Sequence, residues 1–194
     1  MMRISLTPIA TRFAWLGLLT SLAPAAGAPD DEPWLHPYAG PSRSDVDATT
    51  FDGKVLCGYQ GWFNTPCDGT TFGFTHWGQG LDRPEGGRFT VDMWPDVSVY
   101  APDDLCDVPG LKLPDGSSAR LYSAFRKGPV LLHTRWMRQY GIDGIFVSRF
   151  IGKAASPTRS RHVNRALANL REGCHGEGRI WAMMLYKRAS GHQS

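Results

Sequence analysis

The chain has 194 residues, with 21 Lys and Arg against 18 Asp and Glu, and its formal net charge of +3 is too small an excess for a nucleic-acid-binding surface. This length fits one domain with a core of its own. The 7 Trp, 6 Tyr and 22 Gly indicate aromatic faces that can either fill a core or stack on sugar rings.

The first 28 residues have the pattern of a secretory signal peptide. Arg3 and Arg12 make the start basic, residues 13–19 form a short apolar segment, and residues 26–28 match the small-x-small cleavage pattern. The apolar segment is far shorter than the roughly 20 residues of a membrane span. We therefore expect a secreted or periplasmic protein without membrane contact once the signal is removed, rather than a protein with an uncleaved anchor.

Four cysteines in an exported chain permit three disulfide pairings. Cys67 and Cys106 both lie in loop-like surroundings and are expected to pair. Cys57 in a strand and Cys174 at a helix end are expected to be free, buried thiols. Since no C-x-x-C pair occurs, the sequence does not predict a structural zinc site.

The chain after the leader begins with an extended lead-in and a strand. Residues 29–53 are polar and rich in Pro, Asp and Ser, whereas residues 54–63 begin as an apolar run and predict a buried strand. Polar and ring-bearing residues end this strand, namely Tyr59, Gln60 and Trp62. Aromatic faces beside an amide are typical of the rim of a sugar site, so we expect this strand end to border one.

A long irregular region is expected at residues 64–120, which are crowded with Gly, Pro and Asp. Two aromatic clusters lie in it, at residues 72–77 and 89–96. Loops of this length are unusual in a compact domain unless they are functional, so we expect the clusters to serve binding. The Pro-Asp-Gly sequence within residues 111–117 predicts one small hairpin.

The most regular part of the sequence starts with a helix predicted at residues 130–140. Aromatic and apolar residues recur there at a spacing of four, at Leu132, Trp136 and Tyr140. Pro129 suits the first helical position, and Gly141 suits the C-terminal cap. Residues 142–149 are continuously apolar at their centre, which predicts a strand buried on both faces.

A second helix is predicted at residues 161–172 and is expected to close in Gly173 and Gly176. Its apolar positions are Val163, Ala166, Leu167 and Leu170. Four arginines are expected on its solvated face, at Arg159, Arg161, Arg165 and Arg171. Residues 180–185 predict a third strand. Strands that alternate with helices in this way predict an α/β fold with right-handed crossovers, either an open doubly wound sheet or a TIM-like barrel.

Five motifs in a fixed order point to a known family. They are residues 55–63 (VLCGYQGWF), 74–77 (FTHW), 92–96 (DMWPD), 122–125 (YSAF) and 141–146 (GIDGIF). Together they resemble bacterial proteins related to glycoside hydrolase families 71 and 99, some of them labelled xylosidase/arabinosidase, whose relatives include endo-α-mannosidases and α-1,3-glucanases. The resemblance spans roughly residues 54–184 and is more specific for the family than for the substrate.

The resemblance implies a (β/α)8 TIM barrel that acts on glycosidic bonds and needs no metal or organic cofactor. Such a barrel takes about 250 residues, whereas the 166 residues (194 minus 28) after the leader predict only three barrel strands. In relatives the acid and base carboxylates lie on later strands, and an Asp-Leu-Ser-Gly-like segment follows the third strand. This chain has a short basic tail there, residues 186–194. We therefore expect residues 54–185 to be the amino-terminal part of such a barrel, truncated and inactive as it stands.

Barrel enzymes place their chemistry at the carboxyl ends of the strands, and this rule sorts the candidate residues. Those expected to bind sugar, at strand ends or in the aromatic loops, are Tyr59, Gln60, Trp62, His76, Trp77, Asp92, Trp94, Asp96 and Arg149. For His76 and Trp77 the alternative is a packed loop anchor. Asp143 begins its strand and is expected to serve a turn or a cap.

Asp92 and Asp96 form a close carboxylate pair around an aromatic residue, but their spacing does not suit catalysis. On an extended segment their Cα atoms would lie ~13 Å apart, whereas glycosidases hold their two carboxyl groups roughly 5–9.5 Å apart. We expect Asp92 to bind a sugar hydroxyl instead. A Ser/His/Asp triad is not expected either, because no Gly-x-Ser-x-Gly elbow occurs.

Three hypotheses follow from these patterns. The first is a secreted glycoside-hydrolase-like protein that acts on, or derives from an enzyme acting on, polysaccharides or oligosaccharides. The second is a non-catalytic glycan-binding module. The third is a complete α/β domain with an open sheet and a different function.

Overall fold

The computed structural model describes residues 36–83, 87–152 and 156–186. The predicted signal peptide, the beginning of the lead-in and nearly all of the predicted tail lie outside these ranges. Within them the chain forms two groups of elements, a parallel α/β part and an antiparallel part inserted between the first strand and the first helix.

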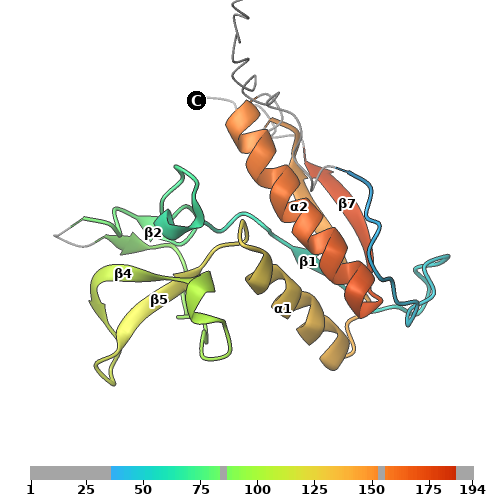
Figure 1. The fold of residues 1–194 in the computed structure, drawn as a ribbon, viewed down its shortest axis with the longest axis horizontal. Helices are drawn as coiled ribbons and strands as arrows, with labels where there is room; N and C mark the ends of the chain where they lie inside the picture. Colours follow the sequence, from blue (N-terminus) through green and yellow to red (C-terminus); the bar gives the residue numbers. More distant parts are fainter. Residues whose placement is uncertain (1–35, 84–86, 153–155, 187–194) are drawn as a thin grey trace, which may run out of the picture. The chain divides into compact units, whose positions relative to one another are not determined.

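The parallel part contains the three predicted strands, β1 (Leu56–Tyr59), β6 (Gly144–Phe150) and β7 (Ile180–Tyr186). They form one sheet in the order β1-β6-β7, and both pairings are parallel (Figure 1). Asp143 precedes β6, and its carboxylate Oδ2 accepts a hydrogen bond of 2.9 Å from the backbone N–H of Val55. Asp143 therefore links the segments that lead into β1 and β6, 88 residues apart, and does not form the turn or cap that was predicted.

Two helices, α1 (Lys127–Gln139) and α2 (Pro157–Glu177), pack against each other (Figure 1). One hydrophobic core joins them to β6, with Val130 from α1, Ile145 and Val147 from β6, and Leu170 from α2. Alternate residues of a strand point to one face, so both helices cover the face of the sheet that carries Ile145 and Val147. The prediction that β6 is buried on both faces holds only in part, since Phe146 is half-buried and packs against the exposed Phe51.

The first helix differs from its prediction in two details. It begins at Lys127, so Pro129 is its third residue rather than its first, although its missing N–H still falls in the first turn where no intrahelical partner exists. Its buried face is formed by Pro129, Val130, Thr134 and Met137. Tyr140, which the spacing of apolar residues included, is 79% exposed. Gly141 follows the helix with φ of 71°, which fits its predicted role after the last turn.

The second helix runs longer than predicted at both ends. It continues through Gly173 and Gly176 to Glu177 and is capped by Gly178, whose φ of 63° is the left-handed conformation that glycine adopts easily. The prediction that the helix ends at Gly173 was wrong. This glycine lies inside the helix, where its missing side chain lets α2 pack closely against α1. A Cβ atom there would come within 2.4 Å of the Thr134 Oγ1 on α1.

The prediction that residues 64–120 are irregular was wrong for part of that region. Short strands β2 (Gly78–Gln79) and β3 (Arg88–Phe89) pair antiparallel, as do β4 (Leu105–Lys112) and β5 (Ser118–Tyr122), and two short 3-10 helices lie at η2 (Pro66–Asp68) and η3 (Pro102–Asp104). The predicted hairpin turn is correct and joins β4 to β5. β4 was not predicted because it contains Pro109 and Gly110, which are typical of loops. In the structure these two residues lie where the register of the β4–β5 pair shifts in a bulge.

The inserted part has a core of its own. Its buried members are Phe74, Trp77, Leu81, Cys106, Val108 and Leu121. A disulfide joins Cys67 and Cys106, which confirms that pairing. Cys57 and Cys174 are free as predicted, but only Cys174 is buried, and Cys57 is half-buried. The bond ties η2 to β4, two segments 39 residues apart in the chain.

The described elements form an α/β structure with a parallel sheet of three strands in chain order. This order occurs at the start of a (β/α)8 barrel and also in one half of a doubly wound sheet. The assignment to a truncated TIM barrel therefore stays a prediction. Within the ranges described, none of the helices combines the length and the apolar character needed to cross a membrane.

Candidate functional site

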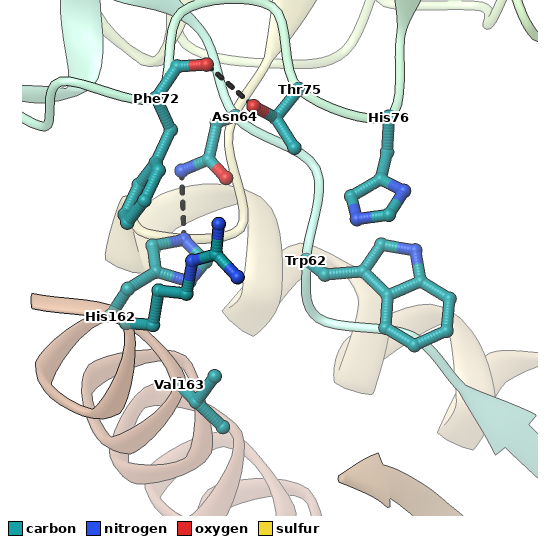
Figure 2. Close-up of a pocket in the computed structure, with 8 residues that line it drawn as sticks. Trp62, Asn64, Phe72, Thr75, His76, His162 and Val163 are labelled. Atoms are coloured by element: carbon teal, nitrogen blue, oxygen red, sulfur yellow. Dashed lines mark hydrogen bonds between the residues drawn. The ribbon is translucent and has the colours of Figure 1, made fainter. Parts of the chain in front are cut away.

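A cavity of about 230 Å³ lies between the segment that follows β1 and the first turns of α2 (Figure 2). Its lining consists of Trp62, Asn64, Phe72, Thr75, His76, Arg159, His162 and Val163. Figure 2 shows Trp62 and His76 on one side of it and Asn64, Phe72 and His162 on the other. We call this space the Trp62 cavity.

One wall of the Trp62 cavity belongs to a row of aromatic rings. The Trp62 ring stacks on His76 at 5.1 Å and on Phe150 at 5.4 Å between ring centroids. Phe150 in turn lies 5.3 Å from Tyr186. Trp62 follows β1, Phe150 ends β6 and Tyr186 ends β7, so the rings gather because parallel strands bring their carboxyl ends to one edge of the sheet.

The opposite wall is a buried polar network. Asn64 is 2% exposed, and its Nδ2 lies 2.9 Å from Asp68 Oδ2 and 2.7 Å from His162 Nε2. An ionised carboxylate only accepts hydrogen bonds, so the Asn64 amide nitrogen must face Asp68 and donate to both partners. His162 Nε2 is then an acceptor. This assignment makes His162 a neutral imidazole with its proton on Nδ1.

Asp68 anchors this network from outside the cavity. Its carboxylate accepts from the Asn64 amide, from the hydroxyl of Ser123 at 2.7 Å, and from the backbone N–H groups of Thr65 at 3.2 Å and Thr70 at 2.7 Å. Burial alone would raise the pKa of Asp68, but hydrogen bonds from Ser123, Thr70 and Asn64 outweigh it and lower the pKa below its usual value. Asp68 therefore stays ionised and orients Asn64.

Aromatic rings hold His162 in place. Its ring stacks on Phe125 at 5.4 Å and meets the edge of Phe72 at 5.3 Å. His162 is 5% exposed, which leaves it little freedom to turn. The cavity thus combines a flat aromatic surface with fixed hydrogen-bonding groups, an arrangement that can stack on one face of a ring and bind its hydroxyls.

The structure places six of the nine predicted site residues in three separate cavities. Only Trp62 and His76 lie together in the Trp62 cavity. Tyr59 and Arg149 line a much smaller space of about 20 Å³ beside α2, and Trp94 and Asp96 line an open groove of about 720 Å³ next to β4 and β5. The predicted residues therefore do not converge on one site.

The three other predicted residues line none of these cavities, since Trp77 is buried in the core and Gln60 and Asp92 face solvent. Trp77 is 3% exposed, and its indole N–H donates to the Tyr122 carbonyl at 2.9 Å, so it is the packed loop anchor that was its alternative role. Arg149 donates to the Asn164 side chain at 2.7 Å. Gln60 and Asp92 are exposed and line none of the three cavities.

A second histidine, half-buried, joins three segments away from the Trp62 cavity. His133 of α1 pairs through Nδ1 with the Tyr59 hydroxyl at 2.9 Å and through Nε2 with the Tyr100 hydroxyl at 2.7 Å. Burial lowers the pKa of His133 from 6.5 to about 4, and burial also raises the pKa of Tyr59 well above its usual value. Tyr59 is therefore a structural partner of His133 in this chain.

The arginines of α2 do not share one environment. Arg159 and Arg161 are exposed, as predicted. Arg165 is half-buried with its guanidinium 5.1 Å from the centre of the Phe125 ring, and Arg171 donates to the His36 carbonyl at 2.7 Å. The prediction of one solvated arginine face was wrong for these two, because long arginine side chains also cover apolar surface.

Asn64, Asp68 and His162 were not among the residues predicted from the sequence. For His162 a signal existed: it lies four residues before Ala166 and eight before Leu170, which places a polar side chain on the buried face of the helix. Buried polar groups need partners, so such a position predicts a hydrogen-bond network. Asp68 accepts hydrogen bonds from the nearby Asn64, Thr65 and Thr70, whereas nothing local marks the pairing of Asn64 with His162, which is 98 residues away.

Comparison of the chain with protein-family models, curated proteins and solved structures finds no match. In the part of the chain that the structure describes, no group of three or more His, Cys, Asp or Glu side chains is placed to hold a metal ion.

Proposed function

We propose that this chain is a carbohydrate-binding protein of the glycoside hydrolase 71/99 type and that the Trp62 cavity is its sugar site. The observation that carries the proposal is the stack of Trp62 on His76 and Phe150 at the carboxyl ends of β1 and β6, opposite the network of Asn64 and His162. Such a pairing of an aromatic wall with fixed polar groups suits a pyranose ring, which has an apolar face and a rim of hydroxyls.

Binding is favoured over hydrolysis at this cavity because none of the described residues that line it is a carboxylate. Glycosidases need two carboxyl groups that flank the scissile bond, one of them with a raised pKa as the acid. Asp68 is the nearby candidate, yet its lowered pKa and its four hydrogen bonds suit an ionised anchor.

The open groove beside β4 and β5 is a poor alternative site for hydrolysis. Asp96, Asp107 and Asp115 line it together with Trp94. Hydrogen bonds from Ser98 lower the pKa of Asp96, and hydrogen bonds from Ser117 lower the pKa of Asp115, so neither is poised as a general acid near neutral pH. We therefore assign sugar binding, not catalysis, to the described residues.

Trp62→Ala should abolish most of the sugar affinity. The test is calorimetric titration with oligosaccharides of α-mannan, α-1,3-glucan and xylan. We expect Trp62→Ala to weaken binding roughly tenfold or more, which corresponds to about 1.4 kcal/mol and is the size of one aromatic contact.

Two further variants serve as controls that separate a loss of sugar binding from a loss of folding. Trp62→Phe keeps a ring in the stack and should retain part of the affinity, and Tyr140→Ala removes an aromatic residue that is 79% exposed at the end of α1 and should bind like the unchanged chain. The proposal fails if no sugar binds, or if Trp62→Ala binds as tightly as Tyr140→Ala.

A further inference from the structure

We propose that the sugar bound in the Trp62 cavity carries an anionic group, and that Arg159 binds this group. The inference rests on the proposed function and names the class of sugar. Its basis is the charge of the cavity lining: Arg159 is its one residue with a permanent charge among those that the structure describes, and no carboxylate accompanies it there.

Arg159 differs from the arginines that have structural partners. Arg135 and Arg138 of α1 pair with Glu177, and Arg138 also pairs with Asp45. Arg159 is exposed at the rim of the cavity and forms no ion pair with any carboxylate in the described ranges. A guanidinium beside a cavity, with its donors directed to no acidic side chain, is suited to an anionic ligand.

The carboxylate of Asp68, which anchors Asn64 next to the cavity, already has hydrogen-bond partners of its own. Donors from Asn64, Thr65, Thr70 and Ser123 surround the oxygens of Asp68. The Asn64 amide nitrogen points toward His162, and its oxygen points away from that ring (Figure 2). Arg159 can therefore bind an anion while the Asn64 oxygen accepts a hydrogen bond from a sugar hydroxyl.

The position of Arg159 on its helix supports the same assignment. It is the third residue of α2, a helix of 21 residues. The helix dipole places partial positive charge at this end, which adds to the guanidinium in favouring an anion. His162, one turn further, accepts a hydrogen bond from Asn64 as a neutral imidazole, so the positive charge at this end of the helix comes from Arg159 and the dipole.

The chemistry points to a sugar with a carboxylate or a sulfate ester. A uronic acid has an apolar ring face for Trp62 and a carboxylate that a guanidinium can bind through two parallel hydrogen bonds. A sulfated sugar offers the same combination. The test therefore uses both, with neutral forms of the same sugars as controls.

The experiment measures binding of oligogalacturonate and oligomannuronate, each beside its methyl ester, and of a sulfated galactan oligosaccharide beside its desulfated form. We expect the anionic form to bind roughly tenfold more tightly than its neutral counterpart in at least one pair, in keeping with one charge-assisted hydrogen-bonded pair. Higher salt should reduce the difference, because Arg159 is exposed.

Arg159→Gln should abolish this preference, so that the anionic form binds no more tightly than its neutral counterpart. Arg161→Gln is the matched control, since Arg161 is exposed on the same helix but does not line the cavity. Equal binding of anionic and neutral forms, or a preference that survives in Arg159→Gln, would overturn the inference. If neutral sugars bind through Trp62 without any such preference, only this inference fails, whereas absence of all sugar binding also removes the proposed function.

Discussion

Gly173 and Gly176 lie one turn apart on α2 and look equivalent in the sequence, yet their surroundings differ. A Cβ atom on Gly173 would lie 2.4 Å from the Thr134 Oγ1 and 2.9 Å from its Cγ2, whereas a Cβ atom on Gly176 would meet nothing within 4 Å. Thr134 is fully buried, and its hydroxyl donates to the Leu131 carbonyl at 2.9 Å, so it cannot easily turn aside.

Gly173→Ala should destabilise the chain, and Gly176→Ala should stabilise it. Alanine gains about 1 kcal/mol over glycine in a helix interior, but at Gly173 the overlap with Thr134 should cost about 1–3 kcal/mol and outweigh that gain. Urea unfolding followed by circular dichroism measures both free energies. Equal effects of the two substitutions would contradict the close contact between α1 and α2.

At the same scale, only the aromatic residues of the candidate site could be predicted from the sequence, and its polar network could not. Trp62 could be predicted because it follows a recognisable strand, and His76 because it belongs to an aromatic cluster. Asn64 and His162 could not be paired in advance, since 98 residues separate them. A hydrogen bond between such residues depends on the path of the whole chain between them.

At the scale of elements, the predicted βαβαβ series was found because its signals are local. Apolar runs marked β6 and β7, and Gly141 marked the end of α1. The β4–β5 pair was largely missed because β4 contains Pro109 and Gly110, which usually end strands. Its bulge accommodates them, and burial of Ala119 and Leu121 stabilises the pair.

The disulfide between Cys67 and Cys106 should contribute substantially to the stability of the inserted part. It closes a loop across 39 residues, for which loop closure predicts about 4 kcal/mol. The double variant Cys67→Ser, Cys106→Ala should lose about this amount in urea unfolding. Reductant should destabilise the unchanged chain but not the double variant. A stable double variant would show that the core around Trp77 and Leu121 holds these segments without the bond.

At the scale of the whole molecule, His133 connects the parallel part to the inserted part. Its two ring nitrogens pair with Tyr59 at the end of β1 and with Tyr100 just before η3. Only the neutral imidazole can accept from one tyrosine while it donates to the other. The stability of the folded chain is therefore linked to the protonation of this residue.

Stability should fall between pH 6.5 and pH 4. The pKa of His133 is about 4 in the folded chain and 6.5 when unperturbed, so the unfolded chain binds the additional proton in this window. The contribution of His133 is complete above pH 6.5 and is lost as pH falls to about 4, with a size on the order of 3 kcal/mol. Urea midpoints measured across this range should show it.

His133→Phe removes this titration and serves as the comparison. It should be less stable at pH 7, because Tyr59 and Tyr100 lose their partner, and its stability should depend less on pH between 6.5 and 4. The same pH dependence in both chains would rule out His133 as its source.

The sequence by itself determined the α/β series, the disulfide pair and the hairpin turn, because periodicity, turn residues and the surroundings of single cysteines are properties of short segments. Only the tertiary structure decided that Trp62, His76, Phe150 and Tyr186 form one row and that Asp68, Asn64 and His162 form one network. The physical reason is that the parallel register of β1, β6 and β7 brings their ends to one edge, and the first turns of α2 lie against the segment that follows β1. Neither arrangement is encoded within a single stretch of the chain.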